Sequence, residues 1–155
     1  MSRLPQQVSE FLNNRNVGVA GVSRDPKQPA NTVYRKLRTS GYRVFAINPN
    51  TNQVEGDPCY PDIRSIPETV DAVVIATHPN TAVQIVRECA DLGIQQVWFH
   101  RSFGEGSVSE EAVRECEKRG ITCLIGGCPM MYCEPVDFGH RCMRWILKLN
   151  RRVPG

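Results

Sequence analysis

The chain has 155 residues, of which 41% are hydrophobic and 23% are charged, and its formal net charge is +3. This length and composition predict one globular domain over residues 1–155, and no second domain is expected. Its apolar runs fall short of the about 20 residues that span a bilayer, and the N-terminus lacks the apolar core of a signal peptide. We therefore expect a cytoplasmic protein with no membrane partner.

Apolar runs alternate with turn formers along the whole chain. This alternation predicts helices over about 5–13, from about 31 to 41, and over about 81–92, 109–118 and 137–149. The strands that it predicts cover 17–21, 42–47, 71–76, 96–100 and 121–125. Residues 53–70 contain three prolines and are expected to be irregular.

The fold class predicted by this order is α/β: a Rossmann-like, doubly wound, parallel five-stranded sheet with helices on both faces. In such a sheet, the ligand lies beyond the carboxyl ends of the strands, near the point where the strand order reverses. The unusual loops of this chain, including Thr77-His78-Pro79 and the segment after His100, all follow strands and should share that edge.

The most informative stretch is the turn that ends the first strand, Gly21-Val22-Ser23-Arg24, with Lys27 close behind. A strand, a glycine turn and a helix N-terminus bring unpaired backbone N–H groups and a helix dipole to one point. Ser23 adds a hydroxyl group, and Arg24 and Lys27 add two cations. This combination predicts a phosphate-binding turn. The alternative is that Ser23 only caps the loop and that both cations are surface charges.

The first turn and the end of the second strand indicate which phosphate-containing ligand binds, because both differ from the pattern of an NAD site. A site for NAD calls for Gly-x-Gly-x-x-Gly at the first turn and an acidic residue at the end of the second strand. Here the turn contains Gly18-x-x-Gly21-x-Ser23, and the second strand ends in Asn48-Pro49. Coenzyme A, with its diphosphate and separate 3′-phosphate, fits the two cations better. NADP binding, with Arg24 on the 2′-phosphate, remains an alternative.

Four runs carry a specific resemblance that covers about residues 15–130. They are Val19-Ala20-Gly21-Val22-Ser23-Arg24, Gly41-Tyr42-Arg43-Val44-Phe45-Ala46-Ile47-Asn48-Pro49, Asp71-Ala72-Val73-Val74-Ile75 and Gly120-Ile121. These runs resemble the single-domain CoA-binding proteins of the YccU type, which are similar in fold to the CoA-binding domain of the succinyl-CoA synthetase α subunit.

The resemblance implies a stand-alone, non-catalytic module that binds coenzyme A or an acyl-CoA. It implies that Gly21, Val22, Ser23 and Arg24 cradle the phosphates. It also implies that Asn48 and Pro49 border the adenosine and that Thr77 and Pro79 flank the pantetheine. In contrast, Trp98 to Gly106 departs from the family pattern. His100, at a strand end on the ligand edge, joins the candidate cofactor contacts.

An acyl-CoA-using enzyme is the main functional alternative, with His100 or His78 as a general acid. The sequence contains no Gly-x-Ser-x-Gly elbow and no second domain that could supply an acyl site, so we assign no catalytic residue. Asn48-Pro49 can also be a plain turn, and His100 can be a histidine with a structural role.

Seven cysteines in a chain without an export signal predict reduced thiols rather than disulfides. The spacing of Cys123, Cys128, Cys133 and Cys142 matches no zinc motif, and no metal site is expected. Cys128 follows two glycines at a strand end, where it could form a mixed disulfide with the CoA thiol. The basic C-terminal helix and tail at about 137–155 predict a solvated surface. No nucleic-acid partner is expected, and a protein partner is left open.

Overall fold

The computed structural model describes residues 6–100, 108–126 and 129. Within these residues the helices are α1 (Gln6–Leu12), α2 (Pro29–Thr39), α3 (Pro79–Asp91) and α4 (Glu110–Arg119). The strands are β1 (Asn16–Ala20), β2 (Arg43–Ile47), β3 (Gln53–Val54), β4 (Asp57–Tyr60), β5 (Ala72–Ile75), β6 (Gln96–Phe99) and β7 (Thr122–Ile125). The helix expected over 137–149 lies outside the described residues.

The described strands form one seven-stranded sheet in the order β3-β4-β2-β1-β5-β6-β7. All neighbouring strands pair in parallel except β3 and β4, which are antiparallel. The expected α/β class and doubly wound parallel sheet are confirmed, but the expected number of five strands is too low. The order from β4 to β7 is that of dinucleotide-binding folds, with its reversal between β1 and β5.

The two additional strands come from a hairpin in the segment that was expected to be irregular. Glu55 and Gly56 both have positive φ, at 52° and 78°, which is the backbone of a tight two-residue hairpin turn. Pro58 lies in β4 close to the sheet edge, where a missing N–H group is tolerated. Asp57 fixes the hairpin to α2, because its carboxylate accepts hydrogen bonds from Tyr34 and Arg38, each at 2.7 Å.

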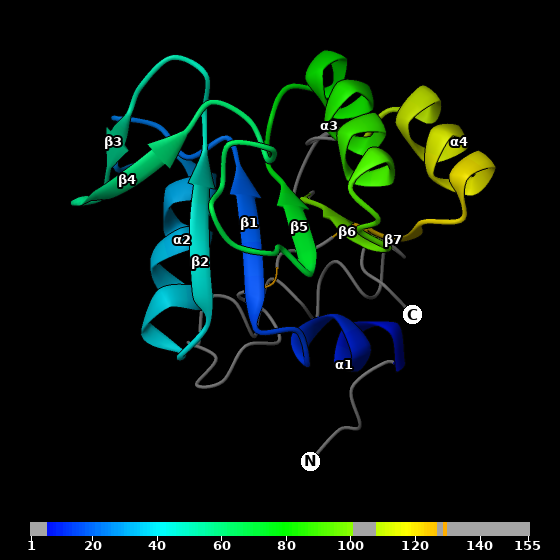
Figure 1. Cartoon of the computed structure of the whole chain (residues 1–155), viewed down its shortest axis with the longest axis horizontal. Helices are drawn as coiled ribbons and strands as arrows, with labels where there is room; N and C mark the ends of the chain where they lie inside the picture. The colour runs from blue at the N-terminus through cyan, green and yellow to red at the C-terminus, as the bar shows by residue number, and fades with distance from the viewer. Residues whose placement is uncertain (1–5, 101–107, 127–128, 130–155) are drawn as a thin grey trace.

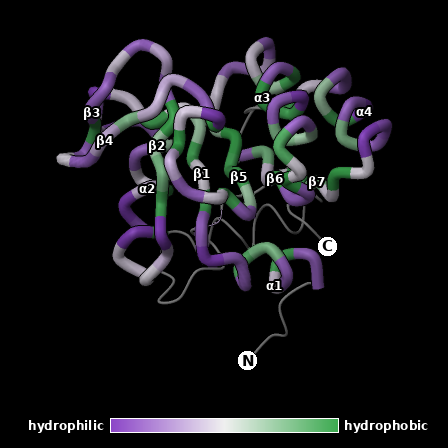
Figure 2. The backbone as a smooth tube through the Cα atoms, in the orientation of Figure 1, coloured by the Kyte–Doolittle hydropathy of each residue, from purple (hydrophilic) through white to green (hydrophobic). Residues whose placement is uncertain are grey.

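Helices cover both faces of the sheet (Figure 1). One core contains side chains of α1 and α2, and the other contains side chains of α3 and α4. Successive side chains of the central strands pack into opposite cores, so all four residues of β5 are buried. The tube in Figure 2 is accordingly most hydrophobic along the central strands. This construction explains why these strands are continuous apolar runs.

The reversal of strand order brings the turn after β1 against the end of β5. A Cβ atom added to Gly21 would lie 2.3 Å from the carbonyl oxygen of Ala76, and the φ of Gly21 is +106°. The Gly21 N–H also donates to Ile47 O at 3.0 Å, and the Ala76 N–H donates to Ala20 O at 3.0 Å. Glycine is therefore required here, for both its backbone angle and its size.

We predict that Gly21→Ala destabilises the fold much more than Gly41→Ala. Both glycines have positive φ, but a Cβ at Gly41 would meet nothing within 4 Å. Backbone strain alone should cost about 1 to 2 kcal/mol at Gly41, and the clash should raise the cost at Gly21 to about 3 kcal/mol or more. Urea unfolding of both variants measures the difference, and equal losses would contradict the assigned close contact.

Candidate functional site

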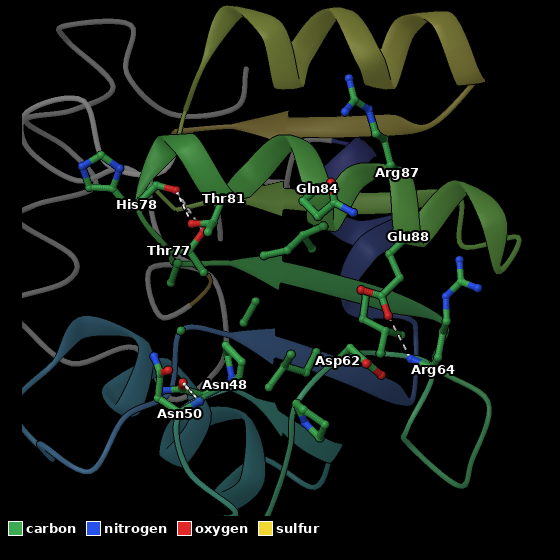
Figure 3. A pocket seen from close by; sticks show the side chains of 18 of the residues that line it. Asn48, Asn50, Asp62, Arg64, Thr77, His78, Thr81, Gln84, Arg87 and Glu88 are labelled. Carbon is green, nitrogen blue, oxygen red and sulfur yellow. Dashed lines mark hydrogen bonds between the residues drawn. The ribbon is translucent and has the colours of Figure 1, made fainter.

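A pocket of about 710 Å³ opens at the carboxyl edge of the sheet (Figure 3). Its walls are the turn after β1, the loop 47–50 after β2, the segment 61–64, and residues 76–78 with one face of α3. The volume lies within the range typical of small-molecule sites. The pocket therefore occupies the place where parallel sheets with this strand order bind ligands.

The two ends of the pocket differ in charge. The acidic lining residues are Asp62, Glu88 and Asp91, and all three come from the segment 61–64 or the second half of α3. Arg64 neutralises part of this end, because its guanidinium contacts Asp91 at 2.8 Å and its N–H donates to Glu88 at 3.0 Å. Hydrogen bonds from Ser65 lower the pKa of Asp62, which keeps that carboxyl ionised. Arg87 also lines this end and lies 3.5 Å from Glu115 of α4. Three carboxylates against two arginines make this end less favourable for an anionic group than the start of α3.

The opposite end is lined by polar side chains and the beginning of α3. Asn48, Thr77 and His78 lie together there, and Figure 3 shows them on the side of the pocket away from Arg64. His78 caps α3, because its Nδ1 accepts a 3.4 Å hydrogen bond from the Asn80 N–H and its carbonyl accepts from the Thr81 hydroxyl. The dipole of this 13-residue helix favours negative charge at its start.

Two asparagine side chains hold the turn that leads out of β1. The Asn31 Oδ1 accepts from the Ser23 N–H at 2.9 Å, and the Asn31 Nδ2 donates to Ser23 O at 2.7 Å. The Asn48 Nδ2 donates to Val22 O at 2.9 Å, and its Oδ1 accepts from the Asn50 N–H. The amide of Asn48 thus connects the turn after β1 to the loop after β2.

The structure brings some of the expected ligand contacts into the pocket and leaves others beside it. Those that line it are Gly21, Asn48, Pro49 and Thr77. The remaining described candidates are outside its lining: Val22, Ser23, Arg24, Lys27, Pro79 and His100. The lining residue His78, considered only as a general acid, was not among the expected contacts.

The candidates outside the lining differ in their surroundings. Val22 is fully buried in the core. The Ser23 hydroxyl forms a local turn, because it accepts from the Asp25 N–H at 3.1 Å. Pro79 is the first residue of α3, and the half-buried His100 follows β6 and donates its N–H to Ile75 O at 2.9 Å.

Arg24 and Lys27 remain available as cations. Both side chains are exposed, and neither forms an ion pair with a described residue. In contrast, the α2 arginines Arg35 and Arg38 pair with Glu55 and Asp57. The loop after β1 thus presents two cations that have no ion-pair partner among the described residues, with the exposed carboxylate of Asp25 between them.

Sequence reasoning missed the far wall of the pocket and the role of Asn31. Asp62 and Arg64 fall in the segment that was expected to be irregular, and nothing in the local pattern places them opposite α3. Asn31 left a weak signal: it is polar but lies in the first turn of α2 beside the buried Ala30 and Val33, and it is only 1% exposed.

The described cysteines, Cys59, Cys89, Cys116 and Cys123, are free thiols. Burial raises the pKa of Cys89 to about 12. Cys116 hydrogen-bonds to Cys123, and this contact raises the pKa of Cys116 and lowers that of Cys123. No group of three or more His, Cys, Asp or Glu side chains in the described part of the chain could hold a metal ion. Cys128, Cys133 and Cys142 lie outside it.

No helix between residues 6 and 126, as far as the structure describes them, is long and apolar enough to cross a membrane. The loop 101–106 and the basic tail from 137 onward lie outside the described residues.

A family model described as a CoA binding domain matches residues 15–134 of this chain. The α subunit of an ADP-forming acetate–CoA ligase II from Pyrococcus furiosus is 31% identical over 106 residues. The match covers 68% of this chain but only 23% of that subunit, so the chain spans less than a quarter of the ligase subunit.

Solved structures share the fold. A conserved hypothetical protein from Pyrococcus furiosus matches with a TM-score of 0.62 and 31% identity, over 70% of this chain and 90% of the other. A dinucleotide-forming acetyl-coenzyme A synthetase 1 from Ca. Korarchaeum cryptofilum, in complex with phosphate and ADP, matches with a TM-score of 0.65 and 28% identity. That match covers 76% of this chain and 28% of the synthetase.

Among the four described cysteines, we predict that Cys123 is alkylated first in the folded protein. It is the half-buried one of the four, and its pKa is lowered, whereas burial keeps Cys89 protonated near neutral pH. Timed alkylation followed by peptide mass spectrometry measures the order. Modification of Cys89 in the native protein as fast as of Cys123 would contradict it, and Cys123→Ser controls for peptide assignment.

Proposed function

Because this chain belongs to the CoA binding domain family, we propose that it binds coenzyme A or an acyl-CoA in the pocket at the carboxyl edge of its sheet, as a non-catalytic module. The observation that carries the proposal is the position of this pocket between the turn after β1 and the start of α3, with Arg24 and Lys27 exposed in the loop that follows this turn. A cytoplasmic location is part of the proposal.

The charge distribution supports one orientation of the ligand. The phosphates belong at the end with Gly21 and the α3 N-terminus, because the acidic residues lie at the other end. Arg24 and Lys27 complete this phosphate site, and the backbone of Val22 and Ser23 forms the turn that leads to them. Asn48 and Pro49 border the adenosine, and Thr77, Pro79 and His100 follow the path of the pantetheine.

Two features favour CoA over a nicotinamide dinucleotide. The residue that follows β2, Asn48, has an amide rather than an acidic side chain, and this side chain hydrogen-bonds to Val22 O and the Asn50 N–H. It therefore lacks the charge that would hold ribose hydroxyls. Ligase activity is not proposed, because the chain corresponds to only part of the ligase subunit it matches.

Direct binding tests this proposal. Titration calorimetry and thermal shift of the full chain with CoA, acetyl-CoA, NADPH and ATP should give binding by CoA and its acyl form, and weaker binding by the others. At about 100 times its dissociation constant, the ligand should add about 2.7 kcal/mol of stability. No heat with CoA would contradict the proposal, and tighter binding of NADPH would favour the dinucleotide alternative.

The two exposed cations give a second prediction. Arg24→Ala/Lys27→Ala should weaken CoA binding about tenfold or more, because contacts between charged groups and phosphate are stronger than neutral ones. The matched control is Arg114→Ala/Lys118→Ala, which removes the same charge from two exposed residues of α4. Equal loss of affinity in both double variants would indicate a general charge effect rather than a phosphate site.

A further inference from the structure

The peptide units on either side of Ser23 are held in fixed orientations. The unit between Val22 and Ser23 is gripped at both ends: its N–H donates to the Asn31 Oδ1 at 2.9 Å, and its carbonyl accepts from the Asn48 Nδ2 at 2.9 Å. The next unit is gripped at its carbonyl, which accepts from the Asn31 Nδ2 at 2.7 Å.

The trans geometry of a peptide then fixes the remaining group. The C=O and N–H of one trans unit point in opposite directions. Since Ser23 O points to Asn31, the N–H of Arg24 in the same unit points away from Asn31 and α2. This N–H has no hydrogen-bond partner among the described residues. Of the two donors in these two peptide units, Asn31 thus leaves one unpaired, on the residue whose side chain is an exposed cation. The Val22 N–H, which precedes both units, also has no hydrogen-bond partner among the described residues.

Asn31 is itself locked by a further contact. Its second Nδ2 hydrogen donates to Glu55 Oε1 at 2.8 Å, and the same oxygen accepts from Arg35 at 2.6 Å. Arg35 also donates to Pro26 O at 3.1 Å, in the loop that follows the turn. If the Asn31 amide were flipped, its NH₂ group would face the Ser23 N–H and its oxygen would face the Glu55 carboxylate. Only one orientation of the Asn31 amide therefore satisfies these hydrogen bonds.

We infer that Asn31 is a positioning residue for the CoA site: by gripping Ser23 on both sides, it aims the Arg24 N–H as a donor to a ligand phosphate, and Glu55 in the β3–β4 hairpin holds it in place. This inference rests on the proposed function. Asn31 lies outside the pocket lining and acts without touching the ligand.

Asn31→Asp tests the donor directly. It keeps the size of the side chain and the acceptor for the Ser23 N–H, but sets a carboxylate oxygen against Ser23 O and Glu55. Asn31→Asp/Glu55→Gln removes the clash of two carboxylates while the donor to Ser23 O stays missing. This second variant keeps the test valid if the first does not fold.

The control is Tyr34→Phe, on the same helix. It removes a hydrogen bond from α2 to the same hairpin, at Asp57, and leaves the turn untouched. Calorimetry with CoA should show affinity about tenfold weaker in both Asn31 variants and unchanged in Tyr34→Phe. Thermal melting should show that Asn31→Asp/Glu55→Gln recovers most of the stability lost in Asn31→Asp.

Amide NMR distinguishes this positioning role from a purely structural one, because it measures the environment of the Arg24 N–H directly. In the unsubstituted chain, saturation with CoA should shift the Arg24 N–H resonance, and the Asn31 variants should lose most of this shift. CoA affinity that returns together with stability in Asn31→Asp/Glu55→Gln would overturn the inference and leave the proposed function standing. Absence of CoA binding by the unsubstituted chain would overturn both.

Discussion

The arrangement of the site depends on the close packing of the turn after β1 against the carboxyl end of β5. The 2.3 Å that separates a Cβ position at Gly21 from Ala76 O leaves no room for any side chain. β1 lies between β2 and β5, so this contact is at the boundary between the half of the sheet that contains β2 and the half that contains β5. The pocket and the start of α3 take their places from it, since both begin within a few residues of Ala76.

Two kinds of interaction stabilise the structure around this contact. Apolar burial fixes the strands and the inner faces of the helices, as in β5, where no residue is exposed. Hydrogen bonds from buried or half-buried asparagines fix the loops, where burial alone cannot choose a backbone conformation. Asn31 and Asn48 each satisfy backbone groups that the strands leave unpaired. The site is therefore ordered by side-chain amides placed on a frame that apolar packing determines.

Much of the fold could be predicted from the sequence, because its strands are short apolar runs bounded by turn formers. The CoA binding domain could also be recognised, since the Gly-x-Ser-Arg turn and the Asn-Pro loop are local patterns. The β3–β4 hairpin could not, because its two short strands are stabilised by contacts with α2, such as that of Tyr34 with Asp57, rather than by local periodicity. Likewise, the hydrogen bond from the Arg64 N–H to the Glu88 carboxylate at one end of the pocket depends on tertiary packing. The loop after His100 and the C-terminal segment remain predictions.

The same hairpin also ends the sheet on the side of β2, and β3 contains only two residues. An exposed sheet edge is a template on which a further chain can add a strand, and proteins suppress this by keeping edge strands short. Self-association through continuous β-pairing is accordingly discouraged along this flank, and any partner that docks there must be recognised through side chains instead.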